Sequence, residues 1–258
     1  MTTPIKFSAN IGFLWPELPL VDRIHAASNA GFNFVECHFP YDTPANELRQ
    51  ALQDTGLKLL CLNTTLGVNG QDDFGVAARV GRESEAQDCI DQALAYAAAV
   101  GCPNINVVPG KTGRATGSES VFQKNLALAC EKAAASNITV FIEPINQRSA
   151  PSFHCSTINQ ALATIVGVGA NNLKIMFDCF HVQIAEGDLL THFTRAQEHI
   201  GHIQFSAIHD RGEPDVGEID YPWLLNQFLS AGWRGCVGAE YQPRTTTDEG
   251  LGWMSAYS

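Results

Sequence analysis

Short apolar runs recur along the chain at regular intervals. They are rich in Val, Ile, Leu and Phe and are mostly continuous rather than alternating, which is typical of strands covered on both faces of a parallel sheet. The pattern therefore predicts a mainly parallel sheet. Its strands are expected at residues 5–10, 33–39, 57–63, 104–109, 138–144, 173–179, 202–208 and 235–241.

Helix-length stretches separate these runs. The clearest, residues 82–100, begins with Glu83 and Glu85, continues through an Ala-rich body and stops at Gly101, a residue suited to the C-terminal cap. The motifs AGF at 30–32 and AGW at 231–233 each place a Gly between a predicted helix and the next strand. Further helices are expected at residues 20–30, 119–135, 156–166, 188–199 and 221–231.

The alternation of eight strands with helices is typical of a (β/α)8 TIM barrel, and 258 residues is a usual length for this fold. Because no linker or low-complexity stretch divides the chain, we predict a single barrel domain over residues 1–258. The main rival is an open doubly wound sheet, which usually carries a Gly-rich phosphate loop after its first strand. No GxGxxG follows residue 10 here. Gly-rich loops at 66–81 and 109–118 follow strands, on the face where a barrel places its active site.

Composition narrows the class of protein. The chain carries 27 acidic residues against 16 Lys and Arg, a formal charge of −11, which argues against a nucleic-acid binder. It has no apolar stretch of about 20 residues to span a membrane and no signal-peptide pattern at its start, so we expect a cytoplasmic protein. The eight cysteines form no CxxC pair, and we expect buried free thiols.

Four polar residues stand at or near the ends of the last four predicted strands. Because chemistry in a barrel comes from the C-terminal ends of several strands, these side chains are expected to meet at one mouth. Three carboxylates and an amide would repel one another there unless a cation joined them, and an all-oxygen set favours Mg²⁺ or Mn²⁺. The predicted metal ligands are Glu143, Asp178, Gln204 and Glu240.

Histidines and cations near the same mouth are candidates for substrate binding. His181 lies one helical turn beyond Asp178, and His38 and His209 are further candidates. An anionic ligand would need local positive charge in so acidic a protein. The loops after the strands offer Lys111, Arg148, Arg211 and Arg244, and we favour Arg211 and then Lys111.

Several segments resemble the hydroxypyruvate isomerase family, and the likeness covers nearly the whole chain. The most specific patterns are RGEP…GEI…Y, beginning at 211, and EYQPR…T.EGL.W, beginning at 240. The opening FSANIGFLWPELP, AGFNFVECHFPY, GRESE, IEPIN and FDCFHVQIAEGDL fit as well. A sister group, which isomerises 2-oxotetronates, shares most of these motifs.

The resemblance implies a sugar-isomerase type of TIM barrel that converts hydroxypyruvate to 2-hydroxy-3-oxopropanoate. It also implies that Glu143 and Glu240 are the proton donor and acceptor, and that Glu143, Asp178, Gln204 and Glu240 hold a divalent metal. Related ketose epimerases usually carry His where this chain has Gln204, so this residue favours a hydroxypyruvate isomerase over a ketose epimerase.

Moving a carbonyl between adjacent carbons passes through an enediolate, which a metal stabilises while two carboxylates move the proton. The alternatives are a 2-oxotetronate isomerase, a ketose 3-epimerase, a three-zinc DNA-repair endonuclease and a binding protein with an inactive site. The acidic charge and few histidines argue against the endonuclease, and the four-residue set argues against the inactive protein. The expected partner is a small oxo acid, without nucleic acid or membrane, and the chain is a candidate homo-oligomer.

Overall fold

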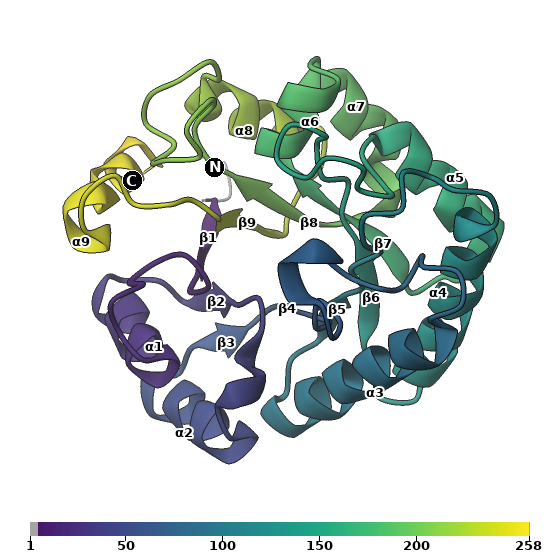
Figure 1. The fold of residues 1–258 in the computed structure, drawn as a ribbon. Coiled ribbons are helices and arrows are strands. Elements are labelled where there is room, and N and C mark those ends of the chain that lie inside the picture. Colours follow the sequence, from purple (N-terminus) through teal and green to yellow (C-terminus); the bar gives the residue numbers. More distant parts are fainter. Residues whose placement is uncertain (1–4, 258) are drawn as a thin grey trace.

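The strands form one parallel sheet that curls around a central axis, and the helices stand in a ring outside it (Figure 1). The structure is a computed structural model and describes residues 5–257. Residues 1–4, part of the stretch judged to lack a signal peptide, lie outside the described residues. The strands are β1 (Lys6–Asn10), β2 (Phe34–Glu36), β3 (Lys58–Leu59), β4 (Leu62–Asn63), β5 (Asn104–Asn106), β6 (Thr139–Ile142), β7 (Leu173–Asp178), β8 (Ile200–Phe205) and β9 (Cys236–Ala239).

The sheet closes through the segment at 57–63. The strand order is β3-β2-β1-β9-β8-β7-β6-β5-β4, so β3 and β4 stand at its two ends. These two strands are consecutive pieces of one extended segment, separated only by Leu60 and Cys61. The first piece pairs with β2 and the second with β5. Between the two pieces, Cys61 O accepts a hydrogen bond from Cys37 N, just after β2, at 3.1 Å, and this bond extends the pairing of the segment with β2. The predicted TIM barrel is therefore confirmed, with one predicted strand divided in two.

The helices cover the outside of the barrel and alternate with the strands. Gly56, Gly101 and Gly169 close three of them in the left-handed conformation. Helix α2 was not predicted, although it buries Leu48, Ala51 and Leu52 on one face. The helices are α1 (Leu20–Asn29), α2 (Ala45–Thr55), α3 (Glu83–Val100), α4 (Ser118–Ala134), α5 (Ile158–Val168), α6 (Cys179–Ala185), α7 (Leu189–Ala196), α8 (Tyr221–Ser230) and α9 (Thr247–Gly250), with short 3₁₀ turns η1 (Pro40–Asp42), η2 (Gly70–Asp72), η3 (Gln197–His199) and η4 (Leu251–Tyr257).

Two further expectations concern thiols and membranes. All eight cysteines are free, and only Cys236 is partly exposed. Burial raises the pKa of Cys130 and of Cys155 to about 12, which keeps these thiols protonated and unreactive. Among the helices described, none is long and apolar enough to cross a membrane.

A polar cluster lies inside the barrel, below its C-terminal mouth. Glu36 accepts hydrogen bonds from Ser8 Oγ, 2.9 Å, and lies 3.1 Å from His202 Nε2. All three side chains are buried. The ring of His202 stacks on Phe141. Gly238 leaves room for this cluster, because a Cβ built there would overlap Glu36 Oε1 and lie 3.0 Å from His202 Nε2.

We expect Gly238→Ala to lower the free energy of unfolding by about 1–3 kcal/mol, the usual cost of forcing an extra methyl into a packed interior. Gly252→Ala is the matched control, since a Cβ there meets nothing within 4 Å, and it should change stability by less than about 0.5 kcal/mol. Urea denaturation of both variants measures the difference. Equal stabilities would show that the barrel interior adapts to the added methyl.

Candidate active site

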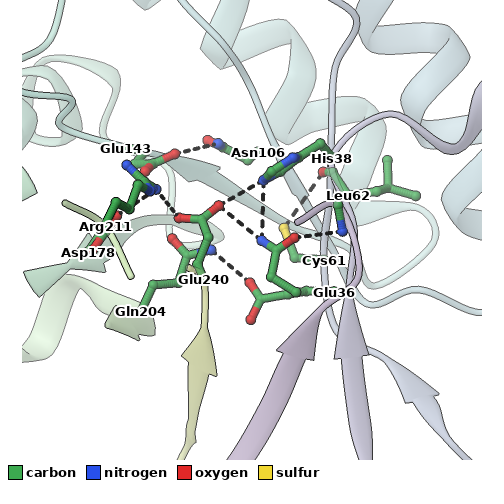
Figure 2. Close-up of polar contacts among 12 residues, drawn as sticks. Glu36, His38, Cys61, Leu62, Asn106, Glu143, Asp178, Gln204, Arg211 and Glu240 are labelled. Carbon is green, nitrogen blue, oxygen red and sulfur yellow. Dashed lines mark hydrogen bonds and ion pairs between the residues drawn. The ribbon is translucent and has the colours of Figure 1, made fainter. Parts of the chain in front are cut away.

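The C-terminal ends of four adjacent strands bring the four predicted metal ligands together. Glu143 directly follows β6, Asp178 ends β7, Gln204 lies near the end of β8 and Glu240 directly follows β9. Asp178 and Gln204 are register partners, and Gln204 is the partner of Gly238. All four side chains are buried. They therefore gather at the mouth of the barrel, as Figure 2 shows.

Arg211 joins two of these carboxylates. Its Nη2 donates to Asp178 Oδ2 at 3.1 Å and to Glu240 Oε2 at 2.5 Å, and its Nη1 lies 2.7 Å from His181 Nε2. The guanidinium also stacks on the ring of Phe180, 4.8 Å from its centroid. A planar fork can meet several acceptors at once in a way that Lys cannot. Arg211 thus supplies the positive charge that lets these acids be buried together.

His181 lies between Asp178 and Glu143. Asp178 caps helix α6 by accepting from Phe180 N at 2.8 Å, and this turn carries His181 back toward the mouth. His181 Nε2 is 3.6 Å from Asp178 Oδ2 and 3.8 Å from Glu143 Oε1. One ligand atom from each of the three residues lies within 4.8 Å of the others. The arrangement adds His181, predicted as a substrate contact, to the candidate metal ligands.

Glu240 is also held by side chains from the neighbouring strand β1 and from the residues just after β2. His38 Nε2 lies 2.8 Å from Glu240 Oε1, and Asn10 Nδ2 donates to the same oxygen at 2.9 Å. His38 is only partly buried and so connects this carboxylate to the open mouth. His209, the other histidine considered for the mouth, is exposed.

Glu36 fixes the orientation of Gln204. Gln204 Nε2 donates to Glu36 Oε2 at 2.8 Å (Figure 2). A carboxylate can only accept, so it holds the nitrogen end of the amide and leaves Gln204 Oε1 for another partner. That oxygen is buried and has no hydrogen-bond partner within residues 5–257. Sequence reasoning did not select Glu36, although an acid inside the apolar run at 33–39 was a usable signal.

The pKa values of the buried carboxyl groups at the mouth are shifted in different directions: those of Glu143 and Asp178 are raised and that of Glu240 is lowered. Burial, with Glu240 and Asp178 nearby, raises the pKa of Glu143 well above its usual range. Burial also acts to raise the pKa of Glu240, but Arg211 and His38 outweigh it and bring that pKa to about 2. Burial raises the pKa of Asp178 to about 7 despite Arg211. Burial thus favours the protonated form of Glu143, whereas Arg211 and His38 favour the ionised form of Glu240.

The other candidate cations lie away from these carboxylates. Lys111 donates to Gln71 O at 2.8 Å, and its Nζ lies 5.7 Å from the centre of the Phe74 ring. Arg244 pairs with Asp210 and Glu213 and ties two loops together. Arg148 is exposed. Of the cations considered, Arg211 is the one in contact with the carboxylate cluster, and the substrate-binding role of Lys111 stays a prediction.

Comparison with known proteins places this arrangement in a family. Residues 24–257 match the family described as xylose isomerase-like TIM barrel. The chain belongs to that family. It is 40% identical to the 2-oxo-tetronate isomerase of Cupriavidus necator, with 98% of both chains covered. It is 38% identical to the hydroxypyruvate isomerase of Escherichia coli, covering 98% of this chain and 99% of the relative.

The structural comparison agrees with the sequence relatives. A crystal structure of an AP endonuclease of family 2 from Brucella melitensis superposes with a TM-score of 0.94, at 34% identity and over 99% of both chains. The Escherichia coli 3-keto-D-glucoside 4-epimerase superposes with a TM-score of 0.80 at 21% identity, over 97% of this chain and 99% of the other, and so shares the fold. The full-length likeness to named isomerases confirms the predicted hydroxypyruvate isomerase family and shows that the chain is an isomerase.

The residues present suit the divalent metal that the family resemblance implies. A hard cation requires oxygen ligands with free lone pairs. Glu143 and Asp178 offer carboxylate oxygens beside His181, and the unpartnered Gln204 Oε1 is a buried acceptor beside Asp178. The chemistry of this donor set therefore fits a divalent cation.

The raised carboxyl pKa values predict how the stability of the metal-free protein depends on pH. Asp178 ordinarily has a pKa of 3.8, so between that value and about 7 the folded state binds more protons than the unfolded state. The free energy of unfolding then falls as pH rises through this window. We expect Asp178→Asn to flatten the fall between about pH 5 and about pH 7, measured by denaturation in chelator.

Asp210→Asn is the control for this experiment. Arg244 lowers the pKa of Asp210, so its contribution to stability is lost only as pH falls below the usual carboxyl range. The slope between about pH 5 and about pH 7 should match that of the wild type. An unchanged slope in Asp178→Asn would instead mean that Asp178 is ionised throughout this window in the folded protein.

Proposed function

We propose that this enzyme is a metal-assisted isomerase of short 2-oxo acids that interconverts hydroxypyruvate and 2-hydroxy-3-oxopropanoate through an enediolate. The observation that carries the proposal is the pair Glu143 and Glu240, buried at one mouth with pKa values shifted in opposite directions. Such a pair can remove a proton from one carbon and supply one to the next. The relatives named as hydroxypyruvate isomerases support the same reaction.

Each side chain has a role in this proposal. Glu240, ionised beside Arg211 and His38, is the base that removes the proton from the hydroxyl-bearing carbon. Glu143, whose pKa burial raises, donates a proton to the neighbouring carbon, and the two glutamates exchange roles in the reverse direction. Arg211 contacts Glu240 and His181 lies next to Glu143, and in this proposal the two side chains bind the substrate's carboxylate. Lys111 would add positive charge on the loop over the mouth.

Glu143, Asp178, Gln204 and Glu240 would hold the divalent metal, with His181 adjacent to them. When bound, a divalent cation acts as a Lewis acid that stabilises developing negative charge on substrate oxygens. Glu36 supports this set by keeping Gln204 Oε1 free.

The alternative substrate is 2-oxotetronate, named in the relative from Cupriavidus necator. A ketose 3-epimerase on the same scaffold is a third possibility, tested with D-fructose and D-tagatose beside the oxo acids. For an endonuclease, the −11 charge works against DNA binding. We retain as proposals a cytoplasmic location and self-association, which cell fractionation and sedimentation test.

We expect Glu143→Gln and Glu240→Gln each to reduce turnover by at least about 10²-fold, because each removes a group that transfers a proton. The measurement is the isomerisation rate of purified, folded variants on hydroxypyruvate. Glu131→Gln, an exposed glutamate of α4, is the control and should keep normal turnover. Normal turnover in either active-site variant would remove that residue from the mechanism.

We also expect a metal requirement with a preference for hard ions. Prolonged chelation should abolish activity, and Mg²⁺ or Mn²⁺ should restore it, because the proposed ligands are oxygens. Calorimetry should show one divalent ion bound per chain, and Gln204→Leu should weaken it. Full activity in protein that elemental analysis shows to be free of metal would overturn this part of the proposal.

A further inference from the structure

A small chamber opens beside Glu143, on the side away from Arg211. Its volume is about 30 Å³. The floor is polar and consists of Asn63, Asn106 and Glu143, whereas the walls are apolar. The wall side chains include Phe39, Leu66, Phe74, Val108, Ile145 and Phe153.

The walls are held by contacts between three loops. Gly75 pairs with Pro109, and Lys111 pairs with Phe153, in isolated antiparallel bridges. The rings of Phe74 and Phe153 meet edge to face, 5.5 Å between centroids. These contacts connect the Gly-rich loops at 66–81 and 109–118 to the loop after β6. The walls of the chamber are therefore fixed by contacts between these loops.

Asn106 presents an unused acceptor at this floor. Its side chain is 2% exposed, and its Nδ2 donates to Glu143 Oε2 at 3.2 Å (Figure 2). That bond fixes which end of the amide faces the glutamate. The other end, Oδ1, is buried and has no hydrogen-bond partner among the described residues. Buried acceptors are normally hydrogen-bonded, so we expect a bound ligand to donate a hydrogen bond to this oxygen.

The two oxygens of Glu143 face different surroundings. Oε1 lies 3.8 Å from His181 Nε2, next to Arg211, and Oε2 accepts from Asn106 at the chamber floor. A substrate whose carboxylate meets Arg211 and His181, and whose reacting carbons lie over Glu143, directs its far end toward the chamber. Hydroxypyruvate ends at the reacting carbons. A four-carbon 2-oxo acid carries one hydroxymethyl group further.

We propose that this chamber is the subsite for the terminal hydroxymethyl group of 2-oxotetronate, and that the enzyme prefers this four-carbon acid to hydroxypyruvate. The inference rests on the proposed function and specifies its substrate. The methylene packs against the apolar walls, and the hydroxyl donates to Asn106 Oδ1. A group the size of a water molecule needs about 10–15 Å³ of such a cavity. A cavity of about 30 Å³ therefore has room for about two of them. The longer tail of a ketohexose exceeds this space.

The first test compares kcat/KM for three substrates with the metal-loaded wild-type enzyme. We expect 2-oxotetronate to exceed hydroxypyruvate by at least about tenfold, the scale for one added group in a fitted pocket. The 4-deoxy analogue, 3-hydroxy-2-oxobutanoate, fills the space without a donor for Asn106. It should fall at least about tenfold below 2-oxotetronate, because the buried acceptor is left unpaired.

The second test fills the chamber from a residue outside the catalytic set. Leu66→Phe should lower kcat/KM for 2-oxotetronate at least about tenfold and leave the value for hydroxypyruvate within about threefold. Val68→Phe is the matched control, because Val68 lies on the same loop but is 83% exposed, and it should leave both values unchanged. Leu66→Ala should keep the preference for four carbons, which shows that the loop still folds.

The outcomes separate the two proposals. Good turnover of hydroxypyruvate with 2-oxotetronate equal or poorer would overturn the subsite and leave the proposed function standing. So would an unchanged substrate ratio in Leu66→Phe. Absence of turnover on both acids in metal-loaded, folded enzyme would overturn the proposed function itself, and the subsite with it.

Discussion

The site depends on the ion pairs of one guanidinium. Asp178 and Glu240 approach each other at the mouth because Arg211 donates to both, at 3.1 and 2.5 Å. Without a cation, burying these acids together would cost a large free energy of desolvation and repulsion. Arg211 itself stacks on Phe180, so its position is set by packing as well as by charge. At Glu240 the same guanidinium, together with His38, outweighs the effect of burial on the pKa, whereas at Glu143 burial prevails.

A second polar layer supports the first from inside the barrel. Glu36 receives hydrogen bonds from Ser8 and Gln204 and lies beside His202, and Gly238 leaves space for it on the neighbouring strand. The layer is buried among core side chains, where each polar group needs a partner. Its effect reaches the mouth because it decides which end of Gln204 faces Asp178. Glu36 thereby leaves the oxygen end of Gln204 free to join the proposed ligand set.

In our proposal, Asn106 links the proton-transferring Glu143 to the recognition of substrate length. It holds Glu143 with its nitrogen and offers its oxygen to the chamber, so a ligand that fills the chamber also touches the network of the catalytic glutamate. Substrate binding and the orientation of Glu143 are then coupled through one amide. This coupling offers a physical reason why close relatives bear the names of three-carbon and four-carbon substrates while sharing a barrel. The walls, rather than the ligand set, differ most easily because they come from loops.

The sequence by itself determined the barrel and the four oxygen-bearing residues, because strand periodicity and acids at strand ends are local signals. It also selected Arg211 and His181 from their places just after those ends. Only the tertiary structure brought Glu36 and Asn106 to the site and chose His38 over His209, since the neighbours of these side chains lie far away in sequence. It likewise separated Lys111 from the carboxylates and formed the chamber from three loops. Contacts of this kind depend on how distant segments pack in space, and no pattern along the chain records them.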